Sequence, residues 1–215
     1  MKKVLLVIAA FVLYSSARSQ NLSFGPTAGF GHSWLSLSEN DGLKNKFHSS
    51  YNVGGKLVYS FVSSWGISAD VKFSSEGGTK QFEGENTEYN YRVNYVRIPL
   101  QGIYFFEQLG DRARPKISIG PSFGFLVGGE SKQEENGTET TSVASKDLFS
   151  GFDFGLNGAI GCNIRVGKAT WLNTDITYYH GFSNIADNGD VRIRNRGLGL
   201  NIGLLFPIGT VKPAK

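Results

Sequence analysis

The sequence has little of what disulfide-stabilised and metal-binding proteins are built from. It holds one cysteine, Cys162, and three histidines in 215 residues. A single cysteine excludes a disulfide framework and a multi-thiolate metal site within the chain. Three of the 22 basic residues, Lys2, Lys3 and Arg18, lie before residue 20, so 22 − 3 = 19 basic residues remain against 18 acidic ones, and no basic patch with interleaved aromatic residues is present. We therefore expect no metal, no other cofactor and no nucleic-acid partner.

Long apolar runs are also missing. No window after residue 20 holds eighteen consecutive apolar residues, which excludes a transmembrane helix there. One short apolar run, at positions 4–13, follows Lys2 and Lys3 and ends in small residues, as in a secretory signal peptide. We expect residues 1–19 to be this signal and residues 20–215 to form one domain.

What the sequence has in abundance is alternation with a period of two. From Ile117 to Val127, for example, apolar residues alternate with Ser118, Gly120 and Ser122. This period is typical of strands with one apolar face. Near Tyr95 the apolar residues change from odd-numbered to even-numbered positions. This change indicates a bulge or a strand projecting beyond a membrane. The eight alternating segments lie at about residues 22–34, 51–61, 65–74, 94–104, 116–127, 152–165, 172–179 and 197–206.

The connections between these segments separate a membrane barrel from a soluble sandwich or lipocalin-like barrel. Short connections alternate with long polar ones, and each apolar face is long enough to cover a lipid band of about 25 Å. The opposite face is rich in Gly, Ser and Asn, which could not fill a soluble core. The sequence therefore predicts an all-β fold: an eight-stranded antiparallel up-and-down transmembrane β-barrel with short periplasmic turns and long extracellular loops. The long connections are residues 36–50, 75–88, 128–148 and 183–191.

Large aromatic residues fall at both ends of the predicted strands. Trp65 and Trp171 open two strands at the expected periplasmic edge, and Trp34, Tyr51 and Tyr178 lie at the outer edge. Two such groups indicate the interfacial girdles of a membrane protein.

Charged residues of both signs lie on or near the lumen-facing parity. Eight strands leave an interior that side chains fill, and buried charges persist when they are paired. We therefore expect an internal ion-pair network that plugs the barrel, with a narrow ion or proton path as the alternative. The predicted network consists of Lys56, Asp70, Lys72, Arg97, Asp153, Arg165 and Asp175.

Two histidines at the outer rim raise the possibility of a lipid-modifying enzyme. His180 precedes Ser183, and His32 precedes Ser33. A serine nucleophile needs a histidine base that an acid orients, and the sequence specifies no acid. We expect no catalytic residue. The acidic residues of the long connections, Glu76, Glu83, Glu85, Glu88, Glu130, Glu134, Glu135 and Glu139, are interpreted as solvated loop residues without a calcium site.

Five strings resemble the PorT-like outer-membrane β-barrel family over nearly the whole mature chain. The resemblance implies a barrel in the outer membrane of Gram-negative bacteria and, for some members, a part in secretion or surface attachment. Members usually stop on an aromatic residue, whereas this chain continues past Phe206. The strings are YVRIPLQGIYFF (95–106), SIGPSFGFLVGG (118–129), FDFGLNGAIG (152–161), YYHGFSNI (178–185) and NRGLGLNIGLLF (195–206).

These observations together predict a small, monomeric outer-membrane barrel that acts as a structural or interaction component. Its expected contacts are outer-membrane lipid, lipopolysaccharide, and protein partners at the extracellular loops or periplasmic turns. The alternatives are a narrow porin-like channel and, less favoured, a rim-located lipid-modifying enzyme.

The alternation of connection lengths predicts the orientation of the barrel. A tag inserted between Gly137 and Thr138 should be labelled on intact cells, because long loops face outward. A tag between Gly167 and Lys168 should be labelled only after the outer membrane is permeabilised. Labelling in the reverse pattern would overturn the predicted topology.

Overall fold

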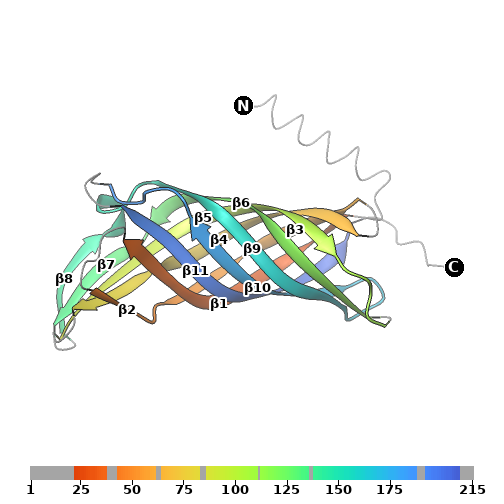
Figure 1. Ribbon diagram of the computed structural model, residues 1–215, viewed down its shortest axis with the longest axis horizontal. Coiled ribbons are helices and arrows are strands. Elements are labelled where there is room, and N and C mark those ends of the chain that lie inside the picture. The colour runs from red at the N-terminus through yellow and green to blue at the C-terminus, as the bar shows by residue number, and fades with distance from the viewer. Residues whose placement is uncertain are drawn as a thin grey trace, which may run out of the picture.

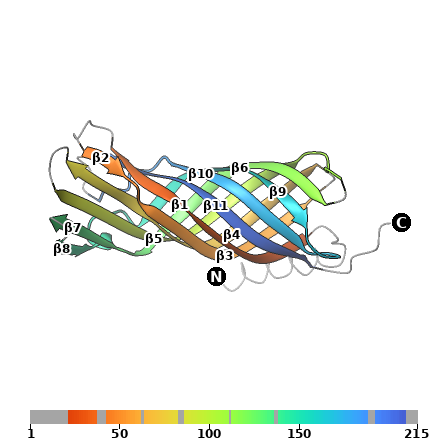
Figure 2. The ribbon, with the colours of Figure 1, turned by 90° about the horizontal axis from the view of Figure 1, so that it is seen from below.

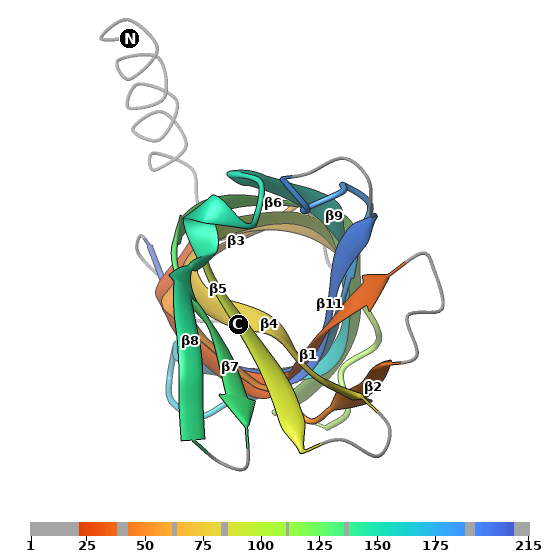
Figure 3. The same cartoon turned by 90° about the vertical axis from the view of Figure 1, so that its left-hand side faces the viewer.

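The chain folds into antiparallel strands that close into a ring (Figures 1 and 3). The computed structural model describes residues 22–37, 43–61, 64–82, 86–110, 112–135, 138–187 and 192–208. In these ranges no helix is long and apolar enough to cross a membrane. The expected signal peptide, residues 1–19, lies outside the described residues.

Eight strands form the ring in the order β1-β3-β4-β5-β6-β9-β10-β11, and β1 pairs with β11 to close it. The fold class predicted from the sequence is confirmed. The ring strands are β1 (Leu22–Leu37), β3 (Ser49–Ser60), β4 (Trp65–Phe82), β5 (Thr87–Phe105), β6 (Ala113–Gly128), β9 (Phe152–Arg165), β10 (Trp171–Gly181) and β11 (Ile193–Pro207). Three short strands and a 3-10 helix complete the described structure: β2 (Leu43–Lys46), β7 (Glu130–Glu135), β8 (Thr138–Ala144) and η1 (Ser145–Asp147).

The apolar face of each ring strand points outward. On β11, Leu198, Leu200 and Ile202 are 51%, 60% and 56% exposed, whereas the intervening Asn201 is 6% exposed. Successive side chains of a strand point to opposite faces, so one sequence register fixes both the lipid-facing and the lumen-facing residues.

The two ends of the barrel differ (Figures 1 and 2). One end, here called the turn end, carries the short connections and the Ser23–Pro207 pairing at which β1 starts and β11 finishes. At the other, here called the extended end, β2, β7 and β8 add to the sheet.

Two of the predicted long loops are largely strand. β4 runs to Phe82 and β5 starts at Thr87, so most of segment 75–88 is a hairpin; β7 and β8 occupy much of segment 128–148. Beyond the lipid a β-ladder still satisfies the backbone but needs no apolar face, so these polar strands show no alternation to detect. The bulge and the projecting strand expected near Tyr95 both occur. The β5–β6 register shifts between Asn94 and Tyr95, and the β4–β5 hairpin extends beyond the neighbouring ring strands (Figure 1).

Aromatic side chains form a continuous belt near the extended end. Consecutive ring centroids lie 5.0–6.4 Å apart from β1 through β10 to β9 and β6. The belt, in order of contact, is Phe47, His32, Trp34, Tyr178, His180, Phe182, Phe154 and Phe123.

A second aromatic group, which includes Trp65, Tyr104 and Phe106, lies near the turn end. Trp171, expected in this girdle, instead packs against buried residues inside the barrel mouth. Trp171 precedes the lipid-facing Leu172, and adjacent side chains of a strand point to opposite faces. Its side chain therefore points into the barrel.

Two apolar clusters occupy the lumen near its ends. The extended-end plug is made of Leu35, Val93, Tyr95, Phe149 and Ile185. The turn-end plug is made of Val58, Ile103, Phe105 and Leu205. Each plug draws residues from several strands, so inward apolar side chains narrow the lumen near both ends.

The register predicts unequal costs for two neighbouring substitutions on β11. Leu200→Arg should lower the free energy of unfolding by about 2–4 kcal/mol, because it places a charge in lipid. Asn201→Ala should lower it by only about 1 kcal/mol, since it removes one lumen hydrogen bond, to the Thr177 hydroxyl. Urea titration of protein folded into lipid vesicles measures both. Equal losses would contradict the register.

Candidate functional site

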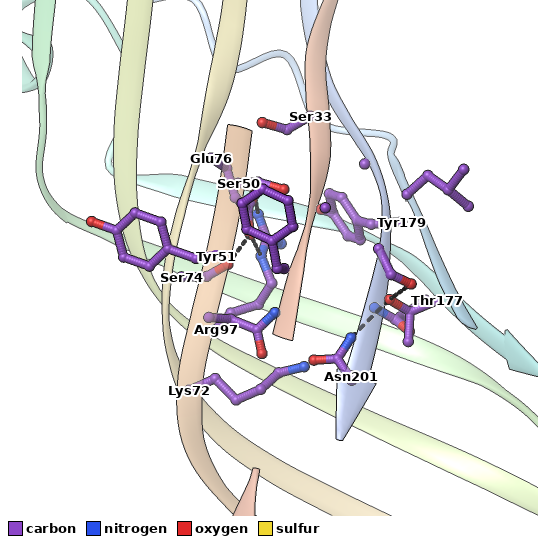
Figure 4. Close-up of a pocket in the computed structure, with 17 residues that line it drawn as sticks. Ser33, Ser50, Tyr51, Lys72, Ser74, Glu76, Arg97, Thr177, Tyr179 and Asn201 are labelled. Atoms are coloured by element: carbon purple, nitrogen blue, oxygen red, sulfur yellow. Dashed lines mark hydrogen bonds and ion pairs between the residues drawn. The ribbon is translucent and has the colours of Figure 1, made fainter. Parts of the chain in front are cut away.

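The middle of the lumen holds charged side chains that the strands aim at one another. Arg97 of β5 lies at the centre of the group nearer the extended end (Figure 4). Its Nε donates to Glu76 Oε1 at 2.7 Å, and its Nη2 donates to Glu76 Oε2 at 2.6 Å and to Asp153 Oδ2 at 2.9 Å. These three residues, here called the Arg97 cluster, form a fork-shaped, charge-assisted arrangement from β4, β5 and β9.

Neutral groups complete the coordination of both carboxylates. Tyr179 and Ser183 donate their hydroxyls to Asp153 at 2.9 and 2.7 Å. Glu76 accepts hydrogen bonds from the Ser74 hydroxyl at 2.6 Å and from the Asn195 amide. The charges are thus hydrogen-bonded as well as paired, which buried ions require.

The Arg97 guanidinium also lies against two aromatic rings. Its central carbon is 4.1 Å from the Tyr179 ring centroid and 5.0 Å from that of Tyr95. Tyr95 belongs to the extended-end plug, so cation–π contact joins the charged middle of the lumen to its apolar closure.

A second group of charges lies toward the turn end. Here Lys56 is 3.6 Å from Asp70 and 3.7 Å from Asp175, and Lys72 is 3.7 Å from Asp70. Lys116 pairs with Asp175, which also accepts a 2.7 Å hydrogen bond from Asn173. This Asp175 cluster consists of Lys56, Asp70, Lys72, Lys116 and Asp175.

The two clusters have opposite net charge. The Arg97 cluster has one cation and two carboxylates, and the Asp175 cluster has three lysines and two carboxylates. With all groups ionised their charges are −1 and +1, and the eight side chains sum to zero. Within these two clusters, neither sign of charge is in surplus.

The space left in this part of the lumen is small. A cavity of about 60 Å³ lies among side chains that include Lys72, Glu76, Arg97, Tyr179 and Asn201 (Figure 4). About 10–15 Å³ of such space holds one water, so the cavity has room for a few water-sized molecules.

Glycines on the inner face make room for these side chains. A Cβ at Gly161 would lie 2.1 Å from the Asp175 carboxylate, and one at Gly29 would lie 2.2 Å from the Asn201 amide oxygen. The small-residue parity seen in the sequence thus reflects space taken by polar groups of neighbouring strands.

The structure brings six of the seven predicted network residues together and excludes the seventh. Arg165 requires a correction: it is exposed at the turn end, and its guanidinium donates to the Lys168 carbonyl at 2.8 Å. It ends β9, where the chain leaves the barrel wall.

Sequence reasoning missed two members of the clusters. Lys116 already stood on the lumen-facing parity, and that parity was the signal. Glu76 was interpreted as a solvated loop residue but is 9% exposed and pairs with Arg97. It continues the even-numbered, lumen-facing positions of Asp70 and Lys72, but it lies beyond Phe73, the last apolar residue of that alternation.

The rim residues considered for catalysis make structural contacts. The Ser183 hydroxyl donates to Asp153 and accepts the Phe154 amide at 2.8 Å, while His180 lies 3.3 Å from the Tyr178 hydroxyl. His32 contacts the backbone of His48. Over the described ranges, neither histidine is hydrogen-bonded to Ser183, and no group of three or more His, Cys, Asp or Glu side chains could hold a metal.

His48 lies between β2 and β3, buried at the extended end, with Nδ1 3.0 Å from the Thr79 hydroxyl. Burial, helped by the Arg92 guanidinium and by His32 and opposed by a backbone hydrogen bond at Glu76, lowers the pKa of His48 to about 4. The side chain is neutral at pH 7. Because the unfolded chain takes up the proton first, its contribution to stability is complete above about pH 6.5 and is lost as the pH falls toward 4.

Comparison with known proteins gives the same class of fold. The family model described as "Outer membrane protein beta-barrel domain" matches residues 15–187. No curated protein matches the sequence.

Similar solved structures include Ail, the attachment invasion locus protein of Yersinia pestis (15% identity, 87% of this chain and 100% of that chain, TM-score 0.43). The N-terminal β-barrel domain of Pseudomonas aeruginosa OprF is 14% identical (87% and 98%, TM-score 0.44). Neisserial surface protein A is 13% identical (84% and 96%, TM-score 0.48).

The geometry predicts that two arginines of similar chemistry differ sharply in importance. Arg97→Met should lower the free energy of unfolding by about 3–5 kcal/mol, because it leaves the carboxylates of Glu76 and Asp153 buried without their cation. Arg165→Met, its exposed control, should change it by less than about 0.5 kcal/mol. Urea unfolding in lipid vesicles gives both values. A small effect at Arg97 would show that the cluster is not a structural core.

Proposed function

Since the chain belongs to the family of outer membrane protein beta-barrel domains, we propose that it serves the cell outer membrane as a structural and interaction component. In this proposal the barrel is a sealed, monomeric support, and the extended end makes the contacts. Its surroundings are outer-membrane lipid and lipopolysaccharide.

The filled lumen is the observation that carries the proposal. Charged clusters occupy its middle, and apolar plugs lie toward both ends. A solute path would require at least one plug and the Arg97 cluster to move together, because Tyr95 belongs to the plug and contacts Arg97. A filled interior favours a barrel whose outer surfaces do the work.

The extended end offers a surface suited to a protein partner. All seven residues of β8 are exposed, and β8 ends the sheet order at this side of the described structure. A strand at the end of a sheet presents backbone groups to which an extended segment of another protein can pair. Lys132 of β7 pairs with Glu130 and Glu139. The further acidic side chains of β7, Glu134 and Glu135, leave this hairpin with a negative net charge, which favours a segment that carries basic residues.

The resemblance to PorT-like proteins suggests the setting of that contact. A part in secretion or surface attachment agrees with a partner bound at the extended end, which faces the exterior in barrels of this class. A narrow channel is the second candidate, and the polar cavity beside Arg97 is the observation that favours it.

Site-specific crosslinking in living cells tests the proposal. A photo-reactive amino acid at Thr140 on β8 should give a reproducible adduct with one protein, identified by mass spectrometry. The matched control is the same group at Lys168, at the turn end, which should not give that adduct.

Two results would contradict the proposal. Adducts formed only from Lys168 would move the contact to the turn end. A steady conductance in planar bilayers that Arg97→Met alters would replace the interaction role with that of a channel.

A further inference from the structure

Two arginines lie on the lipid-facing side of β11, just beyond its apolar residues. Arg194 and Arg196 share parity with the outward Leu198, whereas Asn195 between them is fully buried in the lumen. In the sheet Arg196 pairs with Trp34 of β1 and His180 of β10, both members of the aromatic belt. The pair therefore lies at the outer edge of the lipid band.

Neither arginine has an acidic partner among the described residues. No carboxylate of that part of the chain lies within ion-pair distance of either guanidinium, and the covered Nε of Arg196 has no hydrogen-bond acceptor. Two like charges about 7 Å apart at a membrane edge call for a counter-ion from outside the protein.

An apolar hollow of about 890 Å³ begins beside this pair. It crosses the outer face of the barrel from Tyr178 and Leu198 to Trp65 and Tyr104 near the turn end. Leu198 lies one outward position from Arg196, so the hollow and the arginines are continuous on one face.

Two glycines create the hollow. Gly102, Ile119, Gly158 and Tyr178 are consecutive cross-strand partners on β5, β6, β9 and β10. A Cβ at Gly102 or Gly158 would meet only a backbone oxygen, at 3.8 or 3.9 Å. The wall therefore lacks side chains at these two positions, whereas their lipid-facing neighbours Ile119 and Tyr178 carry bulky ones.

We infer that Arg194, Arg196 and this hollow together form a binding site for a phosphate-bearing, multiply acylated lipid of the outer leaflet, of the lipid A class. The arginines supply planar donors suited to phosphate oxygens, and the hollow takes an acyl chain. Lipids without anionic headgroups could fill the hollow, but they would leave the two arginines without a counter-ion. A second copy of this chain would bring further arginines to the same surface.

Native mass spectrometry of the purified full-length barrel tests this site, with diphosphorylated and dephosphorylated lipid A as probes. Arg194→Gln with Arg196→Gln should weaken binding of the diphosphorylated lipid about tenfold or more, as expected when charge-assisted hydrogen bonds are lost. Restoring charge with Arg194→Lys and Arg196→Lys should recover part of the affinity. The control Arg165→Gln, at the turn end, should bind as the parent does.

The hollow has its own matched pair of variants. Gly158→Ile fills it and should weaken binding of both lipids, whereas Ala28→Ile adds similar bulk to the lipid face of β1 outside the hollow and should have no effect. Heat-modifiable gel migration establishes that each variant is folded.

Four outcomes would overturn the inference. They are unchanged binding in the double glutamine variant, equal binding of the dephosphorylated lipid by the parent, displacement of the lipid by millimolar inorganic phosphate alone, and a dimer that Gly158→Ile dissociates. The third would assign the arginines to free phosphate, and the fourth would assign the hollow to a second copy.

Discussion

The structure depends on one constraint: lipid offers no hydrogen-bond partner to a peptide group, so every strand within the bilayer must pair on both sides. Pairing of β1 with β11 meets this condition for the first and last ring strands. Once the sheet is closed, the period of two divides each strand between lipid and lumen. The Leu200 and Asn201 side chains, adjacent in sequence, therefore lie in environments of opposite polarity.

Closure leaves an interior too narrow for bulk water, and the charged residues there must satisfy one another. Arg97 shows the extent of this, since it contacts two carboxylates and two aromatic rings drawn from four strands, although its Nη1 has no hydrogen-bond partner among the described residues. Such a group specifies strand neighbours as well as contributing to stability. A permeating solute would have to replace the groups that already hold each ion.

The strand positions and their facing could be predicted because they follow from a pattern of neighbouring residues. Lys56, Asp70 and Asp175 were assigned to the lumen from the alternation of positions alone.

The alternation failed at strand ends, where Arg165 turns into solvent. Glu76 lies on the same alternate positions as Asp70 and Lys72, but its role depends on Arg97, 21 positions along the chain, and not on its own neighbours. The apolar plugs were missed for a related reason: in Val93 and Tyr95 an inward apolar residue breaks the rule that holds in mid-barrel.

The seam between β1 and β11 has a consequence for how the protein is made. Residues of the first strand find their β11 partners 156 to 184 positions later, from Leu37–Ile193 to Ser23–Pro207, so no partial chain can close the ring. Until β11 arrives, the growing sheet has two open edges whose donors and acceptors invite pairing with other chains. The late, long-range contact makes folding slow on its own and leaves the intermediate prone to aggregation. A protein that holds those edges during synthesis and insertion would therefore speed closure of a barrel with this topology and protect it from aggregation.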